Sequence, residues 1–506
     1  MKLAALAKRI GLTLDEAGDV SVTDFAIDHR KVAPGTVFGA FRGARFNAED
    51  VIPAAIDAGA VAVVARREAS VSGAVHIASE EPRRTFALLA AGFFTPVPET
   101  IVAITGTNGK TSTAEMTRQI WRMCGERAAS IGTLGVTTPD GSVATGLTTP
   151  DIVTFLRNMS GLAREGVTHV AYEASSHGLD QFRNEGLRVN AGAFTNFSRD
   201  HLDYHGTMDA YFEAKMRLFD EVVEPGGVAV IHVDAQPSQW SAKAIERAQQ
   251  RALEVRTVGE GGDFLKLTAR NASQLGQTLT IEHEGETHTV KLPLIGAYQA
   301  ANAMTSAALA LSTGASVSGV FDALSRLQPV RGRLERACLT PNGAPVYVDY
   351  AHTPDALEAA IAALRPHLKE DRVSELYVVF GAGGDRDAGK RAEMGRVAAL
   401  GSDLAIVTDD NPRDEDPQAI RDAIIEGILA VDDPVRSDKF VDEGDRRKAI
   451  TLAMSFTSEH DIILIAGKGH EQGQIIGSGD TMQVLPFDDV EVARQCAAEL
   501  AKGPLS

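Results

Sequence analysis

The sequence predicts an α/β protein of three domains, and three observations support this. With 506 residues the chain is too long for one hydrophobic core, and at roughly 150 residues per domain it corresponds to about three. Between residues 99 and 327, apolar runs of strand length alternate with segments of helical periodicity, which favours a largely parallel sheet covered by helices. After residue 328 a second series of apolar strands begins, and each strand runs straight into polar residues.

Composition limits the partners that the protein can have. Of its residues, 44% are hydrophobic and 23% are charged, as in an ordinary soluble globular chain. The formal net charge of −18 argues against a general binder of nucleic acids or anionic membranes, because no basic excess exists to hold phosphate groups. An anionic small-molecule substrate would therefore need locally placed cations. No apolar run reaches the length of a membrane span, and the N-terminal residues do not resemble a secretory signal.

The cysteines indicate the cellular compartment. Cys124, Cys338 and Cys496 are far apart and odd in number, which suggests neither a disulfide framework nor a zinc cluster. We therefore expect a reducing environment and a cytoplasmic protein. We also expect small-molecule substrates, a monomer, and no nucleic-acid or membrane partner.

The first 98 residues read as a small α/β unit. Residues 22–43 contain short strands separated by turns, and residues 52–65 contain a helix, a glycine stop and a strand. The segment Phe94–Glu99, with two prolines, is a plausible linker. Four polar residues could contact a ligand, although composition alone favours a solvated loop: Asp28, His29, Arg30 and Arg45.

The segment Thr100–Thr113, TIVAITGTNGKTST, combines a strand, a glycine loop and the start of a helix. Glycines let backbone N–H groups turn toward an anion, and the helix start adds partial positive charge. Lys110 can reach a terminal phosphate, and Thr111 can offer its hydroxyl to Mg²⁺. Only two residues separate Gly106 from Gly109, so the loop is a short variant of the usual pattern. A plain glycine turn would not explain Lys-Thr at this position, and we predict a phosphate-binding loop.

Three later residues of the middle part fit the same chemistry. Glu173 follows an apolar strand, and the carboxyl end of a strand beside a phosphate loop is where a magnesium ligand would lie. His201 lies in a polar cluster after another strand, where a metal ligand and a structural hydrogen-bonding role are equally open. Lys215 falls on the apolar stripe of its helix; its stem could snorkel, but an inward lysine is costly unless paired, neutral or chemically modified.

Toward the end of the middle part, the alternation of strands and helices gives way to a different pattern. Residues 262–294 alternate apolar and polar residues around a turn at Gly285, which predicts an antiparallel hairpin as a β appendage. A helix then follows over Gly296–Leu311, with Gln299 and Asn302 near its start.

Four apolar strands of the last part end in polar residues. Because helices separate them, we expect a parallel sheet whose carboxyl edge gathers all four polar sets, as in open α/β sheets that bind ligands. A single loop of this kind is usually only solvated, but four together indicate a site. A dinucleotide interpretation of the glycines at 381–384 is weak, because the spaced-glycine pattern is incomplete. The polar sets are Asp349 and His352; Asp385 and Arg386; Asp410, Asn411 and Arg413; Lys468, His470 and Glu471.

The motifs together resemble the Mur ligase family of amide-forming enzymes. They follow in order as TGTNGKTST, YEASSHGLDQFR, TNFSRDHLDYHG, EAKMRLF, LQPVRGRLE, VDYAHTPDAL, FGAGGDRDAGKR, TDDNPRDEDP and AGKGHE. The resemblance covers nearly the whole chain and is strongest to members that add meso-diaminopimelate to UDP-N-acetylmuramoyl-L-alanyl-D-glutamate in peptidoglycan synthesis. It implies a UDP-substrate-binding domain over 1–98, a central parallel-sheet P-loop ATPase domain over 99–327, and a C-terminal Rossmann-like domain for the amino acid over 328–506.

The resemblance also implies a reaction and its cofactor. ATP, as co-substrate, would phosphorylate the D-glutamyl γ-carboxylate, and the amine of diaminopimelate would displace the phosphate to form an amide. Mg²⁺ would be held by Thr111 and Glu173 at one site, and by His201 and a carbamylated Lys215 at a second. Lys110 would neutralise the γ-phosphate. The implied ATP-binding set is Gly106, Thr107, Asn108, Gly109, Lys110, Thr111, Ser112, Asn302, Arg333 and Asp349.

Two further residue sets follow from the resemblance. The muramoyl-dipeptide set is Ile27, His29, Thr148, Thr149, Ser175, Gln181 and Arg183. The diaminopimelate set is Arg386, Asp410, Asn411, Pro412, Arg413, Gly467 and Glu471. An arginine fork suits the far carboxylate of diaminopimelate and Glu471 its ammonium, so a lysine substrate would leave Arg413 unpaired. The sequence departs from the common family pattern at His29, Phe46, Asn47, Leu147, His232 and Gln299, which affects the fine uridine and adenine contacts.

Two alternatives define what must be tested. A lysine-adding or folate-glutamylating relative would share the motifs, although a folate enzyme should lack the first domain. A nucleotide switch or motor would share the phosphate loop, but it should also carry a base-reading motif such as Asn-Lys-x-Asp, and the sequence contains none.

Overall fold

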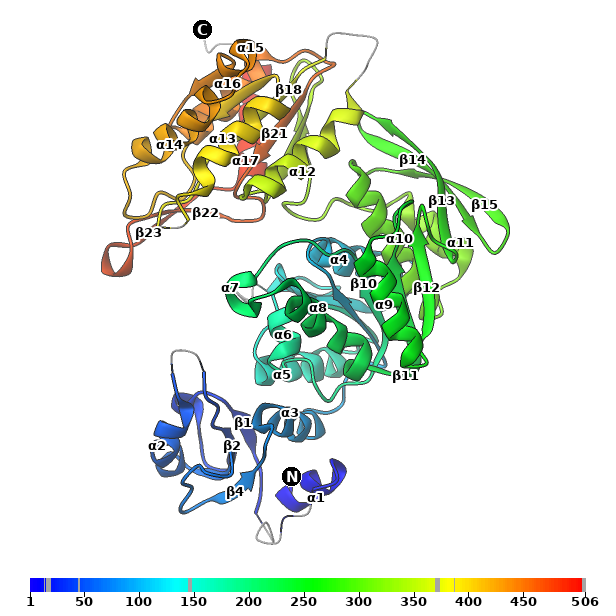
Figure 1. Ribbon diagram of the computed structural model, residues 1–506, viewed down its shortest axis with the longest axis vertical. Coiled ribbons are helices and arrows are strands. Elements are labelled where there is room, and N and C mark those ends of the chain that lie inside the picture. Colours follow the sequence, from blue (N-terminus) through cyan, green and yellow to red (C-terminus); the bar gives the residue numbers. More distant parts are fainter. Residues whose placement is uncertain are drawn as a thin grey trace. The chain divides into compact units, whose positions relative to one another are not determined.

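A computed structural model describes residues 1–12, 14, 20–43, 46–143, 148–368, 374–385 and 387–502. The chain divides into two compact units (Figure 1). The first contains Met1–Lys266 and Met304–Val320, and the second contains Leu267–Ala303 and Phe321–Ser506. The three domain ranges expected from the sequence stay a prediction.

The first unit begins with a small parallel sheet in the order β1-β2-β3-β4. Phe86 lies at the centre of its core, with edge-to-face contacts to Phe25 at 5.4 Å and Phe41 at 5.5 Å between ring centroids. The strands are β1 (Asp24–Ala26), β2 (Thr36–Gly39), β3 (Ala60–Ala65) and β4 (Val75–Ala78). The helices are α1 (Leu3–Arg9), α2 (Ile52–Asp57) and α3 (Pro82–Phe93), with short 3₁₀ turns at His29–Lys31 and Ala48–Val51.

A larger sheet completes the first unit, in the order β13-β12-β11-β10-β5-β9-β6-β7-β8. It is parallel from β13 to β6, and β7 and β8 are antiparallel at its edge. The strands are β5 (Thr100–Thr105), β6 (Ala128–Gly132), β7 (Gly135–Thr137), β8 (Ser142–Val143), β9 (His169–Glu173), β10 (Val189–Phe194), β11 (Val223–His232), β12 (Glu254–Gly259) and the start of β13 (Leu265–Ser273).

Helices connect these strands, and several begin with a capping side chain. Asp151 caps α5 and Thr207 caps α8, each accepting a hydrogen bond from the first turn. The helices are α4 (Lys110–Met123), α5 (Ile152–Arg164), α6 (Ser176–Asp180), α7 (Leu202–His205), α8 (Met208–Arg217) and α9 (Gln239–Gln250), with a π-helical turn at Leu218–Val222.

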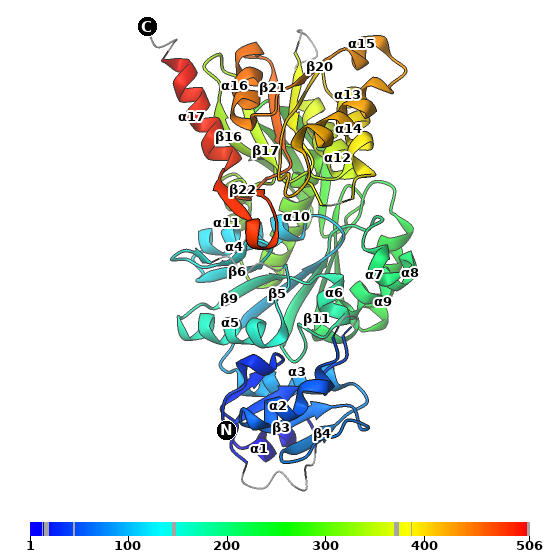
Figure 2. The same ribbon diagram turned by 90° about the vertical axis from the view of Figure 1, so that its left-hand side faces the viewer.

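The second unit is built on a sheet in the order β16-β17-β21-β18-β19-β20. Val378 and Phe380 on one face pack with α12, α13 and α14, whereas Tyr377 and Val379 on the other face pack with α16 and α17 (Figure 2). This alternation is the period-2 pattern of a strand buried on both faces. The strands are β16 (Glu335–Leu339), β17 (Pro345–Asp349), β18 (Leu376–Phe380), β19 (Leu404–Val407), β20 (Phe440–Asp442) and β21 (Ile462–Ala466).

The remaining elements are helices and two hairpins. The hairpins are β14 (Gly276–His283) with β15 (Glu286–Leu292), and β22 (Gly473–Ile476) with β23 (Gln483–Pro486). The helices are α12 (Pro354–Leu364), α13 (Lys390–Gly401), α14 (Pro417–Leu429), α15 (Pro434–Ser437), α16 (Arg446–Phe456) and α17 (Asp489–Ala501), with 3₁₀ turns at Arg365–His367 and Gly479–Thr481. Two helices have residues in both units, α10 (Ala297–Ser312) and α11 (Val317–Leu324).

The α/β prediction is confirmed, and so are its main elements. The predicted strand and helix around the glycine loop are β5 and α4, and the predicted hairpin around Gly285 is β14 and β15. The four polar-ended strands are β17, β18, β19 and β21, which are parallel neighbours. Their expected parallel arrangement is therefore confirmed, while the edge strand β16, which was not among the four, pairs antiparallel with β17 because a tight turn joins them.

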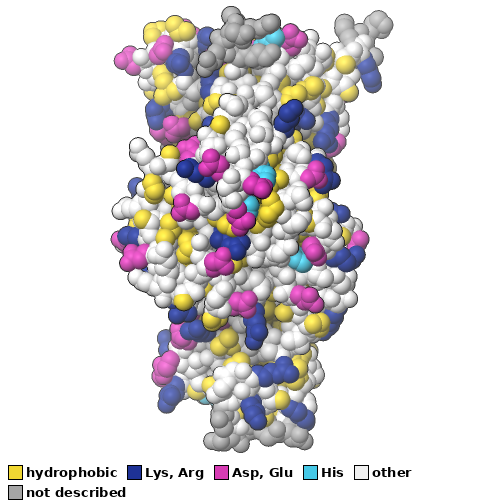
Figure 3. All heavy atoms as spheres, turned by 90° about the vertical axis from the view of Figure 1, so that its right-hand side faces the viewer, with side chains coloured by type: hydrophobic (Ala, Val, Ile, Leu, Met, Phe, Trp, Pro, Cys, Tyr) yellow, Lys and Arg dark blue, Asp and Glu magenta, His cyan; other side chains and the backbone are white. Residues whose placement is uncertain are grey.

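The surface carries side chains of both charges. Acidic and basic side chains are interspersed over the face shown in Figure 3. None of the helices in the described part of the chain is both long and apolar enough to cross a membrane.

Candidate active site

The glycine loop between β5 and α4 has a backbone that only glycine adopts readily. Gly106 has φ of +144° and Gly109 has φ of +85°. A Cβ on Gly106 would lie 2.0 Å from Thr195 Oγ1, so no side chain fits there. Gly109 is the N-cap of α4 and provides no side-chain cap, so the partial positive charge at the start of this 14-residue helix faces the loop, where an anion is favoured.

Residues after β10 brace this loop. Asn108 donates its backbone N–H to Asn196 Oδ1 at 2.9 Å, and Thr195 Oγ1 donates to the Asn108 carbonyl at 2.6 Å. The Thr107 hydroxyl donates to the Ser198 carbonyl at 3.2 Å and accepts from the Ser198 N–H at 3.0 Å. The loop is therefore preorganised before any ligand arrives.

Two lysines converge on one carbonyl of the loop. Lys110 Nζ donates to the Gly106 carbonyl at 3.0 Å and to the Thr107 carbonyl at 2.7 Å, and Lys215 Nζ donates to the same Gly106 carbonyl at 2.7 Å. Lys215 is 1% exposed, with its Nζ 4.4 Å from the centre of the Tyr211 ring. Among the described residues, no carboxylate lies within ion-pair distance of it. Burial, and then the charge of Lys110, hold the pKa of Lys215 well below its usual range.

Glu173 ends β9 beside the loop, because Ile104 of β5 pairs in register with it. Its side chain is buried and accepts hydrogen bonds from the backbone N–H of Thr133 at 2.7 Å and from the Thr133 hydroxyl at 3.3 Å. A Cβ on Gly132 would lie 2.1 Å from Glu173 Oε1, so this glycine makes room for the carboxylate. Thr111, in the first turn of α4, is also buried.

A group of imidazole and phenol rings surrounds His201. The His201 backbone is left-handed, with φ of +51°, and its ring lies 4.9 Å from the His177 ring and 6.0 Å from the Tyr211 ring. Burial lowers its pKa, as do Lys110 and Lys215, while Asp200 at 3.4 Å opposes the shift. The neutral imidazole, which is the metal-binding form, is therefore favoured. Within the described ranges, no three His, Cys, Asp or Glu side chains are grouped closely enough to hold a metal unaided.

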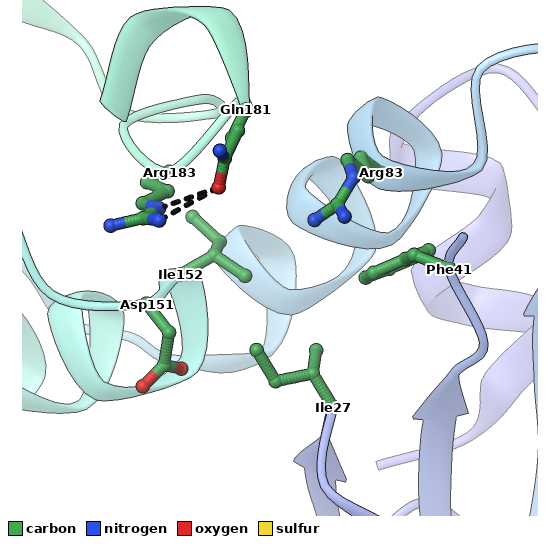
Figure 4. Close-up of a pocket in the computed structure, with 7 residues that line it drawn as sticks. All are labelled: Ile27, Phe41, Arg83, Asp151, Ile152, Gln181 and Arg183. Carbon is green, nitrogen blue, oxygen red and sulfur yellow. Dashed lines mark hydrogen bonds between the residues drawn. The ribbon is translucent and has the colours of Figure 1, made fainter. Parts of the chain in front are cut away.

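A cavity of 110 Å³ collects residues of the muramoyl-dipeptide set (Figure 4). It is lined by Ile27, Phe41, Arg83, Asp151, Ile152, Gln181 and Arg183. Arg183 donates to Gln181 Oε1 at 2.7 and 3.2 Å and to the Thr149 carbonyl at 2.9 Å.

The other expected members of the set connect this cavity with Glu173. The Thr149 hydroxyl lies 2.9 Å from both the Glu173 carbonyl oxygen and Ser175 Oγ, and the Thr148 and Thr133 hydroxyls are 3.1 Å apart. His29 does not line the cavity; it lies in a 3₁₀ turn, 3.9 Å from Asp28.

In the second unit, the three expected nucleotide contacts lie together. Gln299 Nε2 donates to the Arg333 carbonyl at 2.8 Å, and Asn302 Nδ2 donates to Gln299 Oε1 at 3.3 Å. Asp349 accepts from the Leu334 N–H at 2.8 Å. Burial raises the pKa of Asp349, and Arg333 opposes that shift. The Arg333 guanidinium lies 5.0 Å from the centre of the Tyr350 ring.

The expected amino-acid contacts gather at the carboxyl edge of β19 and β21. Asn411 Nδ2 donates to Glu471 Oε2 at 2.9 Å, while Asn411 Oδ1 accepts from Lys468 Nζ at 2.8 Å. Gly467 has φ of +118°, and a Cβ there would lie 2.5 Å from Asp410 Oδ2. Arg386 lies outside the described residues.

Arg413 follows this loop with a left-handed backbone, φ of +52°. Its Nη1 donates to the Gly384 carbonyl at 2.7 Å. No carboxylate within the described part of the chain pairs with it, so the guanidinium keeps donors for a ligand.

Comparison with known proteins identifies the family. The Mur ligase middle domain matches residues 104–310, and the Mur ligase glutamate ligase domain matches residues 332–469. A UDP-N-acetylmuramoyl-L-alanyl-D-glutamate--2,6-diaminopimelate ligase from Zymomonas mobilis subsp. mobilis is 54% identical over 494 residues, 98% of each chain. This chain belongs to the Mur ligase family.

Two further Mur ligases agree with this assignment. The enzyme of the same name from Bradyrhizobium diazoefficiens is 50% identical and covers 95% of this chain and 96% of its own. A solved structure of a ligase with that name has a TM-score of 0.74 at 30% identity, and 99% of each chain is covered.

The residues at which this sequence departs from the common Mur ligase pattern differ in burial and in their contacts. Gln299 is buried and joins Asn302 to the Arg333 backbone, so it occupies a structural position beside the nucleotide contacts. His232 lies 3.8 Å from Asp234, and burial lowers its pKa. Phe46 is 56% exposed, and Leu147 lies outside the described residues.

Sequence reasoning did not identify several residues that shape the Mur ligase site. Thr195, Asn196 and Ser198 brace the glycine loop, and the only signal for them was their place in the motif TNFSRDHLDYHG. Lys468 was noted only as one polar residue at a strand end, although it is fully buried. Arg83 gave no signal, because it reads as one more charged residue at the start of a helix.

Proposed function

We propose that this Mur ligase joins meso-diaminopimelate to the γ-carboxylate of the D-glutamyl residue of UDP-N-acetylmuramoyl-L-alanyl-D-glutamate. The reaction consumes ATP, releases ADP and phosphate, and belongs to peptidoglycan biosynthesis. The full-length identity of 54% to a ligase of that name supports the substrate assignment. The observation that carries the chemistry is the convergence of Lys110 and Lys215 on the Gly106 carbonyl, two residues after Ile104, which pairs in register with Glu173.

The chemistry explains why such a site is needed. A carboxylate is a poor electrophile, so the γ-phosphoryl group of ATP is first transferred to a γ-carboxylate oxygen, which forms an acyl phosphate and ADP. The amine of diaminopimelate then attacks the acyl carbon, the tetrahedral intermediate expels phosphate, and the nitrogen loses a proton. The transferring phosphoryl group carries dispersed negative charge, so cations and positioned N–H donors provide most of the stabilisation.

In this proposal the glycine loop, Lys110 and the start of α4 hold the ATP phosphates. Asn302, Arg333 and Asp349 contact the nucleoside side. Lys110 Nζ would exchange its two carbonyl acceptors in the loop for phosphate oxygens, and the braced loop would keep its N–H groups directed at them.

The residues fit Mg²⁺, which prefers oxygen ligands and keeps several positions for water and substrate phosphates. Thr111 and Glu173 offer a hydroxyl and a carboxylate for one ion, and His201 with Lys215 would hold a second. When bound, Mg²⁺ would neutralise phosphate charge and orient the transferring group.

Carbamylation would make Lys215 a suitable ligand for that second ion. An unmodified lysine offers only nitrogen, but a neutral amine can attack CO₂ to give a carbamate and a proton. Deep burial without a carboxylate partner favours that neutral amine. The inward position of Lys215 on an apolar stripe is then explained.

The amine donor would be held in the second unit by Asp410, Asn411, Pro412, Arg413, Gly467 and Glu471, with Arg386 as a further expected contact. Among the residues that the structure describes, Arg413 has no carboxylate partner, which suits it to the far carboxylate of diaminopimelate. Glu471 is fixed by Asn411 and would accept from the ammonium group. L-Lysine lacks that carboxylate and would be rejected. A cytoplasmic location and a monomeric state remain predictions.

ADP release tests this function. We expect ADP only when ATP, the muramoyl dipeptide and diaminopimelate are all present, with L-lysine giving far slower release. Release with L-lysine at the same rate would indicate a lysine-adding ligase. Brisk release with ATP alone would favour a nucleotide switch.

A further inference from the structure

Arg83, the second residue of α3, lines two adjoining cavities of the first unit. The smaller cavity, of 110 Å³, is the one lined by Gln181 and Arg183 (Figure 4). The larger, of 280 Å³, is lined by Arg42, Arg66 and Phe182, among others. Phe41 and Arg83 line both cavities, so Arg83 lies at the boundary between the smaller cavity and the larger one.

Within the described part of the chain, the side chain of Arg83 has no counter-ion. Its guanidinium lies 4.9 Å from the centre of the Phe41 ring and donates to the Arg42 carbonyl at a long 3.3 Å. No carboxylate lies within ion-pair distance of it among the residues that the structure describes. Burial lowers its pKa, in keeping with a cation that is partly removed from water.

Arg84, the next residue in α3, has carboxylate partners. Arg84 pairs with Glu185 at 3.1 Å and with Glu221 at 3.3 Å. The same helix turn therefore carries one arginine whose charge is compensated inside the protein and one whose charge is not. An uncompensated cation in a half-buried position lowers stability unless a ligand supplies the anion.

A second arginine faces the same cavity. Figure 4 shows Arg83 reaching from α3 toward the side on which Gln181 and Arg183 lie. Arg183 binds neutral oxygens, from Gln181 and the Thr149 carbonyl, and burial lowers its pKa as well. Asp151, the carboxylate in the lining, accepts from the first turn of α5 and from the Thr154 hydroxyl at 2.6 Å, so it is already engaged.

We propose that Arg83 binds an anionic oxygen group of the uridine-diphospho-muramoyl substrate and acts with Arg183 as the second cation on that ligand. The inference rests on the proposed function and deepens it by adding a binding residue. Phosphate and carboxylate share the required chemistry, because both accept two parallel hydrogen bonds from a guanidinium fork. The substrate offers a diphosphate and a glutamyl α-carboxylate, and the experiment below distinguishes them.

The experiment compares Arg83→Gln, Arg83→Lys and the matched control Arg84→Gln, by ADP release with the full enzyme. Arg83→Gln should raise KM for the muramoyl dipeptide by about 10- to 100-fold, the value of one or two hydrogen bonds to a charged group. KM for ATP and for diaminopimelate should stay within about twofold. Arg83→Lys should fall between wild type and Arg83→Gln, because it keeps the charge and loses the fork.

Thermal unfolding separates binding from a structural role. In the substrate-free enzyme, Arg83→Gln should leave the melting temperature unchanged or raise it, because an unpaired cation is removed. Arg84→Gln should lower it while leaving KM unchanged, since Glu185 and Glu221 each lose one of their two arginine partners and keep only Arg217. A lower melting temperature for Arg83→Gln, with all three KM values raised equally, would overturn the proposal.

UDP alone, used as a competitive inhibitor, identifies the anionic group. If its inhibition constant rises with the muramoyl-dipeptide KM in Arg83→Gln, the diphosphate is the ligand; if only the KM rises, the carboxylate is. Both constants unchanged would overturn the inference. Wild-type ADP release with diaminopimelate is measured in the same series, so a failure of the proposed function would be seen separately.

Discussion

Two fully buried lysines of this protein have opposite surroundings. Lys468 in the second unit is 0% exposed, lies 3.4 Å from Asp410 Oδ1, and donates to Asn411 Oδ1 at 2.8 Å and to the Gly473 carbonyl at 3.0 Å. Lys215 in the first unit is 1% exposed and donates to one carbonyl, and the leading charge near it is another cation, Lys110. Burial lowers the pKa of both amines; at Lys468 the neighbouring Asp410 opposes this effect, whereas at Lys215 the charge of Lys110 adds to it and outweighs the opposing effect of Asp200.

The difference shows how to distinguish a structural cation from a functional one. Lys468 donates to Asn411, whose amide in turn donates to Glu471, and the buried ion pair of Arg446 with Asp489 fixes the end of β21 through the Ala466 carbonyl. Lys215, Arg83 and Arg413 lack carboxylate partners among the described residues, and each lies where the proposed reaction brings an anion or a reactive CO₂. Exposure alone would not separate these cases, because both lysines are equally hidden.

The largest expected effect is on activity, from Lys215→Ala. This change removes the proposed carbamate ligand, and kcat should fall by about 1,000-fold, as when a principal electrostatic group is lost. Short carboxylates such as acetate should partly restore activity by filling the space. Lys243→Ala, on α9 of the same unit, is the control and should remain active because Lys243 is about half exposed. Full activity of Lys215→Ala would end the ligand assignment.

The next largest effect is on stability, and it is measured by replacing Lys468 or Lys215 with methionine. Lys468→Met leaves the buried Asp410 without its cation, removes one of the two donors to Asn411 Oδ1, and should destabilise the second unit by about 3 kcal/mol. Lys215→Met replaces an unpaired amine, so in bicarbonate-free buffer the first unit should change by less than about 1 kcal/mol. Hydrogen exchange of β21 and β5 amides reports the two units separately. Equal losses in both variants would contradict the comparison.

A smaller effect is expected for Arg413→Ala. The unpaired guanidinium is proposed to bind the far carboxylate of diaminopimelate, so its loss should raise the diaminopimelate KM by about 10- to 100-fold. KM for ATP should not change. Arg396→Ala removes an exposed arginine that pairs with Glu393 and is the matched control. An unchanged diaminopimelate KM would remove the carboxylate role.

The smallest effect is the pH dependence of stability that arises from His470, in the same loop as Lys468. Burial, with Arg333 and Arg331 nearby, lowers the pKa of His470 to about 4. Its folded-state pKa is below its ordinary value of 6.5, so its contribution to stability is complete above pH 6.5 and is lost as pH falls toward 4. At pH 5 the loss should be no more than about 1 kcal/mol, because the ring is partly exposed.

His470→Asn tests this pH effect. Thermal unfolding at pH 7.5 and pH 5 should show that the variant loses less stability between the two values than wild type does. Identical losses would mean that His470 does not titrate in this window.

Local sequence was sufficient for much of the fold and part of the site. The glycine loop, α4 and Glu173 could be predicted because strand, glycine and helix signals are adjacent in the chain. The burial of Lys215 followed from one helical stripe. The brace from Thr195 and Asn196, and the unpaired state of Arg83, could not be predicted. Both depend on which distant segments come to lie beside them, and an arginine at a helix start reads the same whether or not a carboxylate faces it.

The most direct measurement uses the muramoyl dipeptide labelled with ¹⁸O in both oxygens of its D-glutamyl γ-carboxylate. After one turnover with ATP and diaminopimelate, the account predicts that the released inorganic phosphate carries one ¹⁸O and that the new amide keeps the other. Unlabelled phosphate, with product still formed, would contradict activation of the carboxylate by phosphoryl transfer.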